Sequence, residues 1–344
     1  MKPAARYREA GVDLRAAELA KAKISEVVAA ARSDLALGGV GAFGGMVRLP
    51  PDIPDPVLVM STDGVGTKVL VAARAGRHDT VGEDLVNHCV NDILVHGARP
   101  LAFLDYIATA SVDPDTVASV VEGVARGCRA HDMTLAGGET AEMPDVYQEG
   151  VYDLAGTILG VVSEGEALHG DRIRVGDLLL GYESTGLHTN GYTLARHIVF
   201  ERLGLDVDST VPELDVSIAD ALLAPHRSYH AAVAPVLGRM HGLAHITGGG
   251  IPGNLVRPLP AGCVAAVDSS QWVVPPLFSF LQEAGGVERD EMLRVFNMGI
   301  GMIAMVPSDA LAPVQEAARA AAVPTWVIGE VVRGGGAVPG VRID

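Results

Sequence analysis

The same local order occurs in each half of the chain: an apolar strand, a loop containing glycines, and then a helix. In the first half, residues 56–62 lead into the loop DGVGTK at 63–68. In the second half, residues 176–185 lead into the loop GLHTNG at 186–191. Strands that alternate with helices are typical of α/β domains, and glycine loops between them let a ligand approach the backbone closely.

A chain of 344 residues exceeds what one hydrophobic core usually supports, so we expect two domains. The strand-like segment YDLAGTILGVVS is the last regular element of the first half, and a polar stretch follows it. We therefore expect an N-terminal domain over residues 1–165 and a C-terminal domain over residues 166–344. The predicted fold class is α/β with mixed α+β character. A helical stretch is predicted from residue 217 to about residue 240.

The composition excludes several classes of protein. The formal net charge is −16 with 26 Lys and Arg, whereas a nucleic-acid surface needs clustered basic residues. No apolar run approaches the roughly 18 residues needed to cross a bilayer, and the N-terminal segment does not resemble a secretion signal. We expect a cytoplasmic protein that binds neither nucleic acid nor membrane. Its three cysteines are odd in number and widely spaced, which favours reduced, buried thiols.

The segment TVGEDLVNHCVNDILVHGA has the clearest amphipathic helix pattern in the chain, and Thr80 and Glu83 have capping-box spacing at its start. Its polar side carries Asp84, His88 and Asp92 at positions i, i+4 and i+8. Periodicity alone favours a solvated face. An acidic residue near the end of a helix opposes the helix dipole, however, and this favours a ligand site.

Three acidic residues lie where strands or helices meet glycines: Asp63, Asp92 and Glu139. Carboxylates beside loops of phosphate size would repel ATP unless Mg²⁺ lay between them, and Mg²⁺ typically binds a few carboxylates together with phosphate oxygens. We predict that these three acids hold Mg²⁺. The alternative is that each caps a turn, which is common for Asp and Glu.

Lys68 is the only lysine beyond residue 23, and we predict that it pairs with a nucleotide phosphate. Thr67 would add a hydroxyl to the phosphates or to the metal. The loop is not a Walker A motif, because there the lysine is followed at once by Ser or Thr, whereas here Thr67 precedes it.

The run Thr247, Gly248, Gly249 and Gly250 is predicted to form a nest of backbone N–H groups for an anion such as a substrate phosphate. A plain turned connection is the alternative. A dinucleotide-binding motif also starts at Gly248, but prolines within and after it leave no room for the long helix that such a site needs.

His188 is the only histidine inside a glycine loop between a strand and a helix. It is predicted to act as a general base or to bind substrate, together with Thr189 and Asn190.

In order along the chain, these segments resemble the AIR synthetase (phosphoribosylformylglycinamidine cyclo-ligase) family. They are YREAGVD, TDGVGTK, HDTVGEDLVNHCVNDILVHGARPLAFLDY, GGETAEMP, HTNGY, AHITGGGIPGN and FNMGIGM. The wider superfamily includes formylglycinamidine synthase, selenophosphate synthetase, thiamine-phosphate kinase and a hydrogenase maturation protein. Ala110 and Ser111 depart from the Gly-Lys that is frequent in the family.

The resemblance implies a homodimer of two-domain subunits whose N-terminal strands join across the dimer in a β-barrel, with ATP and Mg²⁺ in a cleft nearby. The metal ligands would be Asp63, Asp92 and Glu139. The other residues around ATP would be Gly64, Thr67, Lys68, Asn91, Gly137 and Gly138. Substrate would contact His188, Thr189, Asn190, Thr247, Gly248, Gly249 and Gly250.

The implied reaction is the ATP-dependent closure of formylglycinamidine ribonucleotide to 5-aminoimidazole ribonucleotide, a step of purine biosynthesis that releases ADP and phosphate. Lys68 and His188 would be the catalytic residues. Two alternatives remain: another ATP-dependent phosphotransfer enzyme of the superfamily, and a non-catalytic nucleotide-binding scaffold.

Overall fold

The structure, a computed structural model, describes residues 12–39 and 41–344. The family-like motif at residues 7–13 therefore lies mainly outside the described residues. None of the helices in these two described ranges is long and apolar enough to span a membrane.

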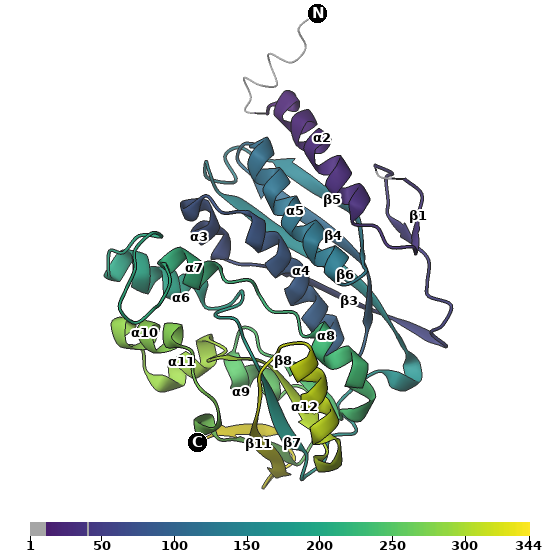
Figure 1. Ribbon diagram of the computed structural model, residues 1–344, viewed down its shortest axis with the longest axis vertical. Coiled ribbons are helices and arrows are strands. Elements are labelled where there is room, and N and C mark those ends of the chain that lie inside the picture. The colour runs from purple at the N-terminus through teal and green to yellow at the C-terminus, as the bar shows by residue number, and fades with distance from the viewer. Residues whose placement is uncertain (1–11, 40) are drawn as a thin grey trace, which may run out of the picture.

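A four-stranded sheet with the order β3-β6-β4-β5 forms the centre of the first half. Its strands are β3 (Pro56–Gly64), β4 (Arg99–Thr109), β5 (Thr134–Glu142) and β6 (Tyr152–Ser163). Strand β6 is antiparallel to both β3 and β4, and β4 is parallel to β5. Three helices lie on one face of the sheet (Figure 1): α2 (Leu14–Ala30), α4 (Asp79–Leu94) and α5 (Pro114–Ala130).

Helices α4 and α5 approach closely because glycines lie at their contact. A Cβ on Gly82 would be 2.1 Å from the carbonyl oxygen of Val120, and one on Gly123 would be 2.2 Å from that of Asp79. Only glycine fits at these two positions. The predicted apolar stripe of α4 packs into the core, and its members are Val81, Leu85, Val86, Cys89, Val90, Ile93 and Leu94.

The other face of this sheet is open. Leu58 and Met60 on β3, and Leu104 and Tyr106 on β4, project from it, and 70% of Met60 is exposed. Strand alternation places these side chains opposite the ones that meet the helices. In the described part of the chain, no helix covers them.

The second half is built on a six-stranded sheet with the order β12-β9-β11-β7-β10-β8. All neighbours are antiparallel except β12 and β9. The strands are β7 (Leu178–Glu183), β8 (Gly242–His245), β9 (Cys263–Val267), β10 (Ile300–Val306), β11 (Thr325–Arg333) and β12 (Gly340–Ile343). The fold is thus mixed α/β, with one main sheet in each half.

Shorter elements complete the described chain. The helices are α3 (Lys68–Ala75), α6 (Tyr192–Arg196) with its π-helical extension His197–Arg202, α7 (Ile218–Leu223), α8 (His230–Val233), α9 (Gly250–Leu255), α10 (Pro276–Gly285), α11 (Arg289–Val295) and α12 (Leu311–Ala320). Short 3-10 turns occur at Glu164–Glu166, Ala234–Arg239, Ser269–Gln271 and Ser308–Ala310. A small hairpin pairs β1 (Ala36–Leu37) with β2 (Met46–Val47).

Two sequence predictions about helices were wrong. The stretch predicted as helix from 217 to 240 is broken after α7, because Pro225 keeps the preceding residue, Ala224, out of the helical region, at φ −50° and ψ 126°. The capping box at Thr80 is absent, since α4 begins at Asp79 after His78 and Glu83 binds Arg126 instead.

Candidate active site

The polar side of α4 is buried against the second half of the chain. Asp84 and Asn91 have no exposed surface, and His88 is nearly as enclosed. The prediction of a solvated face was therefore wrong. The face is buried because of tertiary packing. The loop 186–191, the segment that follows α7 and the end of β8 all pack against this side of the helix.

At one end of this contact, Lys68 and Asp84 form an ion pair of 2.8 Å between Nζ and Oδ2, with both side chains fully buried. Lys68 also donates to the carbonyl oxygens of His188 and Ala224, at 3.1 and 2.9 Å. Burial raises the pKa of Asp84 to about 6 and lowers that of Lys68, while their mutual attraction opposes both shifts. Lys68 would have to leave these partners to reach a phosphate, so its predicted role stays a prediction.

Four imidazoles meet in the middle of the contact: His88, His188, His226 and His245. The rings of His188 and His226 are stacked with their centroids 4.0 Å apart. Burial holds the pKa of both well below the usual range, so both are neutral near pH 7. His188 accepts a hydrogen bond from the Thr185 N–H through Nε2 and lines neither of the two cavities beside the site.

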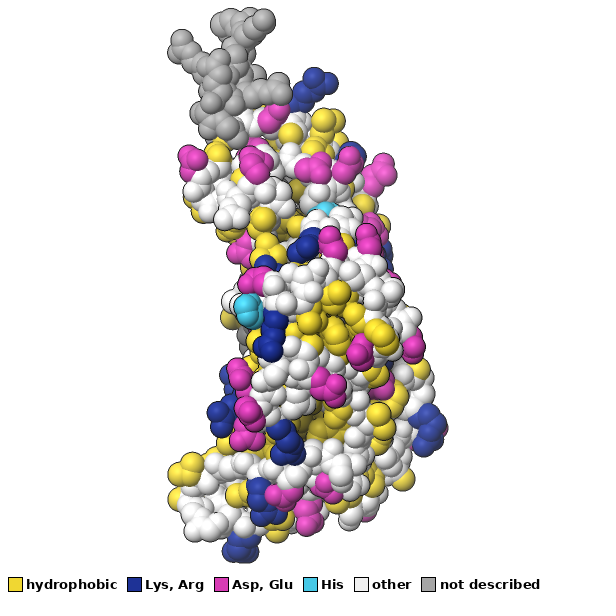
Figure 2. Space-filling view, turned by 90° about the vertical axis from the view of Figure 1, so that its left-hand side faces the viewer, with side chains coloured by type: hydrophobic (Ala, Val, Ile, Leu, Met, Phe, Trp, Pro, Cys, Tyr) yellow, Lys and Arg dark blue, Asp and Glu magenta, His cyan; other side chains and the backbone are white. Residues whose placement is uncertain are grey.

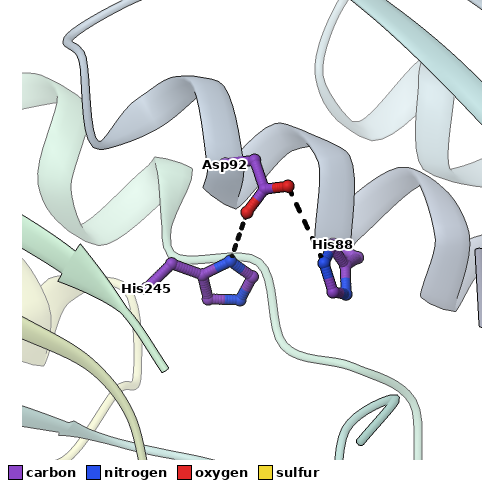
Figure 3. Close-up of side chains that lie close together, drawn as sticks. All are labelled: His88, Asp92 and His245. Carbon is purple, nitrogen blue, oxygen red and sulfur yellow. Dashed lines mark hydrogen bonds and ion pairs between the residues drawn. The ribbon is translucent and has the colours of Figure 1, made fainter. Parts of the chain in front are cut away.

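The contact opens to solvent around Asp92. Figure 3 shows His88 and Asp92 one turn apart on α4, with His245 facing Asp92 from the end of β8. His245 Nδ1 lies 2.8 Å from Asp92 Oδ1, and His88 Nε2 lies 3.7 Å from Oδ2. His88 Nε2 is also 3.2 Å from Oδ2 of Asp63. Burial opposes ionisation of Asp92, but its contacts with His245 and His88 outweigh burial and hold its pKa below the usual range.

A cavity of about 470 Å³ opens at this end. Asp92 and His245 line it together with Thr247 and the cation Arg257. Asn254 holds the loop beside it by donating to the carbonyl oxygens of Thr247, Gly248 and Gly250. Gly249 and Gly250 have φ of 95° and 59°, a region that favours glycine. This cavity is lined both by a carboxylate that could bind a metal ion and by a cation and a hydroxyl suited to an anion.

A second cavity, of about 610 Å³, lies beside the two glycine loops. Thr67 and Gly66 line it from one loop, and Thr189, Asn190 and Gly191 from the other. The hydroxyl of Thr67 lies 3.3 Å from that of Thr193. The structure thus brings together residues that the sequence assigned to ATP and residues that it assigned to substrate. Asn190 also approaches the glycine loop 247–250, since its Oδ1 would lie 3.4 Å from a Cβ on Gly248.

The single chain does not bring Glu139 to the other two predicted metal ligands. Asp63 and Gly138 belong to one row of paired residues across the sheet, with Gly156 and Asp105 between them. Glu139 belongs to the next row, which projects from the open face, whereas Asp63 projects towards α4. Two strands and the thickness of the sheet therefore separate Glu139 from Asp63.

Gly137 and Gly138 lie on β5 with Glu139. A Cβ on Gly138 would be 2.3 Å from Oδ1 of Asp105, so this glycine makes room for a buried carboxylate. Burial raises the pKa of Asp105 to about 7.

Two further residues predicted to lie around ATP are next to the predicted metal ligands. Gly64 follows Asp63 at the end of β3, and Asn91 precedes Asp92 on α4.

Sequence reasoning missed His226, His245, Asn254 and Arg257. The first follows the proline that breaks the predicted helix, so no periodic pattern marks it. A signal existed for His245, because it ends an apolar strand two residues before a glycine loop, a context like that of His188. Arg257 lies three residues after Asn254 and carried no signal.

The sequence pattern of the AIR synthase related protein family matches the chain in two parts: the N-terminal domain at residues 41–162 and the C-terminal domain at residues 174–342. The phosphoribosylformylglycinamidine cyclo-ligase of Geobacter sulfurreducens is 51% identical over 306 residues, which cover 88% of each chain. That of Trichlorobacter lovleyi is 47% identical over 333 residues, or 96% of this chain and 95% of the relative.

Solved structures share the fold at lower identity. The thiamine-monophosphate kinase from Stenotrophomonas maltophilia K279a superposes with a TM-score of 0.71 at 20% identity, over 94% of this chain and 96% of that one. A hydrogenase maturation protein HypE in complex with ATP gives 0.66 at 22% identity, over 93% and 90% of the two chains.

Proposed function

Because the chain belongs to the phosphoribosylformylglycinamidine cyclo-ligase, or AIR synthetase, family, we propose that it closes the imidazole ring of 5-aminoimidazole ribonucleotide. The substrates are formylglycinamidine ribonucleotide and ATP, and the other products are ADP and phosphate. This proposal rests on sequence identity: phosphoribosylformylglycinamidine cyclo-ligases from other organisms are 44–51% identical to this chain over most of its length.

The reaction has to activate an amide, which is a poor electrophile. Transfer of the γ-phosphoryl group of ATP to the amide oxygen turns that oxygen into a leaving group. The amidine-side nitrogen then attacks the same carbon, the C–O bond breaks with release of phosphate, and a proton is lost as the ring closes. Positioning and electrostatic stabilisation supply much of the rate in such transfers.

We propose that Asp63 and Asp92 hold Mg²⁺ at the open end of the site. Their oxygens fit this role because both carboxylates lie within 3.7 Å of His88 Nε2 and remain partly exposed. Mg²⁺ there would offset charge on the transferred phosphoryl group. The substrate phosphate would bind in the cavity that Thr247 and Arg257 line, next to the glycine loop 248–250.

We further propose a homodimer that closes the open sheet face into a barrel. The support is the row of exposed apolar side chains on β3 and β4, which a monomer would leave in water. Glu139, Gly137 and Gly138 lie on the strand beside this face, so we propose that they contribute to the ATP site in the dimer.

The domain limits 1–165 and 166–344 and a cytoplasmic location are also part of the proposal. The catalytic roles of Lys68 and His188 remain proposals that require movement, because both side chains are buried here. Acidic and basic side chains are interspersed among the described residues of the face in Figure 2, which supports a small-molecule substrate over a nucleic acid.

The direct test supplies the purified protein with formylglycinamidine ribonucleotide, ATP and Mg²⁺ and measures aminoimidazole ribonucleotide. Product should form without glutamine, with one phosphate released per ring closed. ATP binding without phosphate release would favour a scaffold, and phosphate transfer to a different acceptor would favour another enzyme of the superfamily.

A further inference from the structure

Three basic side chains line the cavity of about 470 Å³ beside Asp92: His96, His169 and Arg257. All three are exposed residues, so they lie on the side of the cavity that faces solvent. From their convergence we propose that His96 and His169 bind the phosphate group of the ribonucleotide substrate together with Arg257, and that they select for a phosphomonoester. The inference deepens the ring-closure proposal and rests on it for the identity of the substrate.

Backbone contacts hold the segments of the two histidines against each other. The N–H of Leu168 donates to the carbonyl oxygen of His96 at 3.1 Å, and His96 Nδ1 lies 3.4 Å from the carbonyl oxygen of Leu168. Leu168 directly precedes His169 in the chain. No hydrogen bond within residues 12–39 and 41–344 involves Nε2 of His96, so this nitrogen remains for a ligand.

A second close approach brings Arg257 to the same place. Gly170, which follows His169, has a φ of 80°, and a Cβ at this position would lie 2.1 Å from the carbonyl oxygen of Pro258. Only glycine fits there. Because Pro258 directly follows Arg257, the backbone beside His169 touches the backbone beside Arg257. The three basic residues thus come from segments that are in contact around one cavity.

These basic groups have no acidic partner in the described part of the chain. Exposed cations elsewhere do pair with carboxylates, as Arg77 does with Asp220 at 2.6 Å. The only carboxylate that lines the cavity, that of Asp92, is already in contact with His245. A chain with 42 Asp and Glu against 26 Lys and Arg therefore leaves basic side chains unpaired at this cavity, which is expected where an anion binds.

The chemistry of the three side chains fits a phosphate monoester. The guanidinium of Arg257 offers a planar fork of N–H donors, and each imidazole can donate from a ring nitrogen. A phosphate monoester has three acceptor oxygens and typically carries a charge of about −1.5 to −2 at pH 7. A sugar hydroxyl lacks that charge, so the site should distinguish a ribonucleotide from its nucleoside. It uses neither Asp63 nor Asp92, which remain with the proposed Mg²⁺.

The test measures binding of ribose 5-phosphate to the full chain by calorimetry, with ribose as the uncharged comparison. We expect ribose 5-phosphate to bind about 10-fold or more tightly than ribose. His96→Ala and His169→Ala should each weaken its binding by about 5-fold, and the double variant should weaken it further. Both residues are exposed, so the substitutions leave the core intact.

Steady-state kinetics with the ribonucleotide separates binding from chemistry. Each histidine variant should raise KM for the ribonucleotide by about 5-fold and leave kcat within about 2-fold, because the phosphate is remote from the reacting amide and is bound equally before and during the reaction. Arg172→Ala is the matched control. Arg172 is an exposed cation close to His169 in sequence that does not line the cavity, so its variant reports the loss of net charge alone and should bind as the original chain does.

Unchanged affinity for ribose 5-phosphate in both histidine variants would overturn the inference, and so would an equal loss of affinity in Arg172→Ala. Ring closure with an unaltered KM in the histidine variants would reject the inference and leave the proposed reaction in place. No ring closure, combined with histidine-dependent binding of ribose 5-phosphate, would reject the reaction and retain the phosphomonoester site.

Discussion

Lys68 and Asp84 form an ion pair from which water is excluded, although 16 residues separate them and Lys68 begins a different helix. The pair joins α3 and α4 to two loops of the second half through the carbonyl oxygens of His188 and Ala224. Lys68 therefore connects the two halves of the chain in this structure, whereas the sequence alone indicated that it binds a phosphate.

Lys68→Met should destabilise the fold by about 3–5 kcal/mol, because it leaves the Asp84 carboxylate buried without its partner. Denaturant unfolding measures this loss. Lys23→Met is the control, since its pair with Asp115 is exposed and should contribute about 0–1 kcal/mol. Normal stability with lost ATP affinity would instead assign Lys68 to the phosphates.

Asp92→Asn should lower kcat/KM for Mg²⁺-ATP by about 10-fold or more, equivalent to about 1.4 kcal/mol, because it removes charge from a ligand position and preserves size. The unfolding midpoint should change far less than the rate. Asp309→Asn, an exposed change in a distant turn, should leave both quantities unaltered. Unchanged kcat/KM together with a large fall in the unfolding midpoint would contradict a ligand role.

Asp105 should make the protein less stable as pH rises. Its pKa is raised from 3.8 to about 7, so between these values the folded state binds more protons than the unfolded state. The contribution of Asp105 to stability is therefore greatest below about pH 4 and falls, by on the order of 2–4 kcal/mol, as the pH rises from about 4 to about 7.

Asp105→Asn keeps the shape of the side chain and cannot ionise. Unfolding of both proteins in denaturant at pH 5 and pH 8 should show a smaller decrease for the variant. An identical decrease in the two proteins would show that Asp105 is not the group responsible.

Arg257→Met should raise KM for the ribonucleotide by about 10-fold, since a charge-assisted hydrogen bond to phosphate contributes about 1.5–3 kcal/mol. Steady-state kinetics with ATP saturating separates this effect from nucleotide binding. Arg239→Met, on an exposed turn, should leave KM unchanged. A selective rise in KM for ATP would place the nucleotide, and not the ribonucleotide, in this cavity.

Leu104→Asp should shift the protein towards monomers, because it places a charge on the open sheet face. Sedimentation velocity measures the change. Val273→Asp alters an apolar residue elsewhere that is more exposed than Leu104, and it should leave the oligomeric state as it was. A monomeric original chain would contradict the proposed barrel.

Much of the fold could be predicted from local patterns. The apolar stripe of α4 identified a core helix, and the proline that ends α7 could have been used to break the predicted helix there. The positions of Asp63 and Asp92 at element ends also pointed to a shared site, and the structure brings both to His88. The environment of the polar side of α4 could not be predicted, because periodicity does not distinguish water from a second domain as its neighbour.

The sequence by itself determined which segments become strands and helices and where glycines let the chain turn, because these depend on neighbours a few residues apart. Only the tertiary structure decided the partners of the polar groups. His226 donates its backbone N–H to Asp84 across 142 residues, and His245 meets Asp92 across 153. Such contacts depend on how two separately patterned surfaces pack, and a buried polar group takes whichever partner that packing supplies.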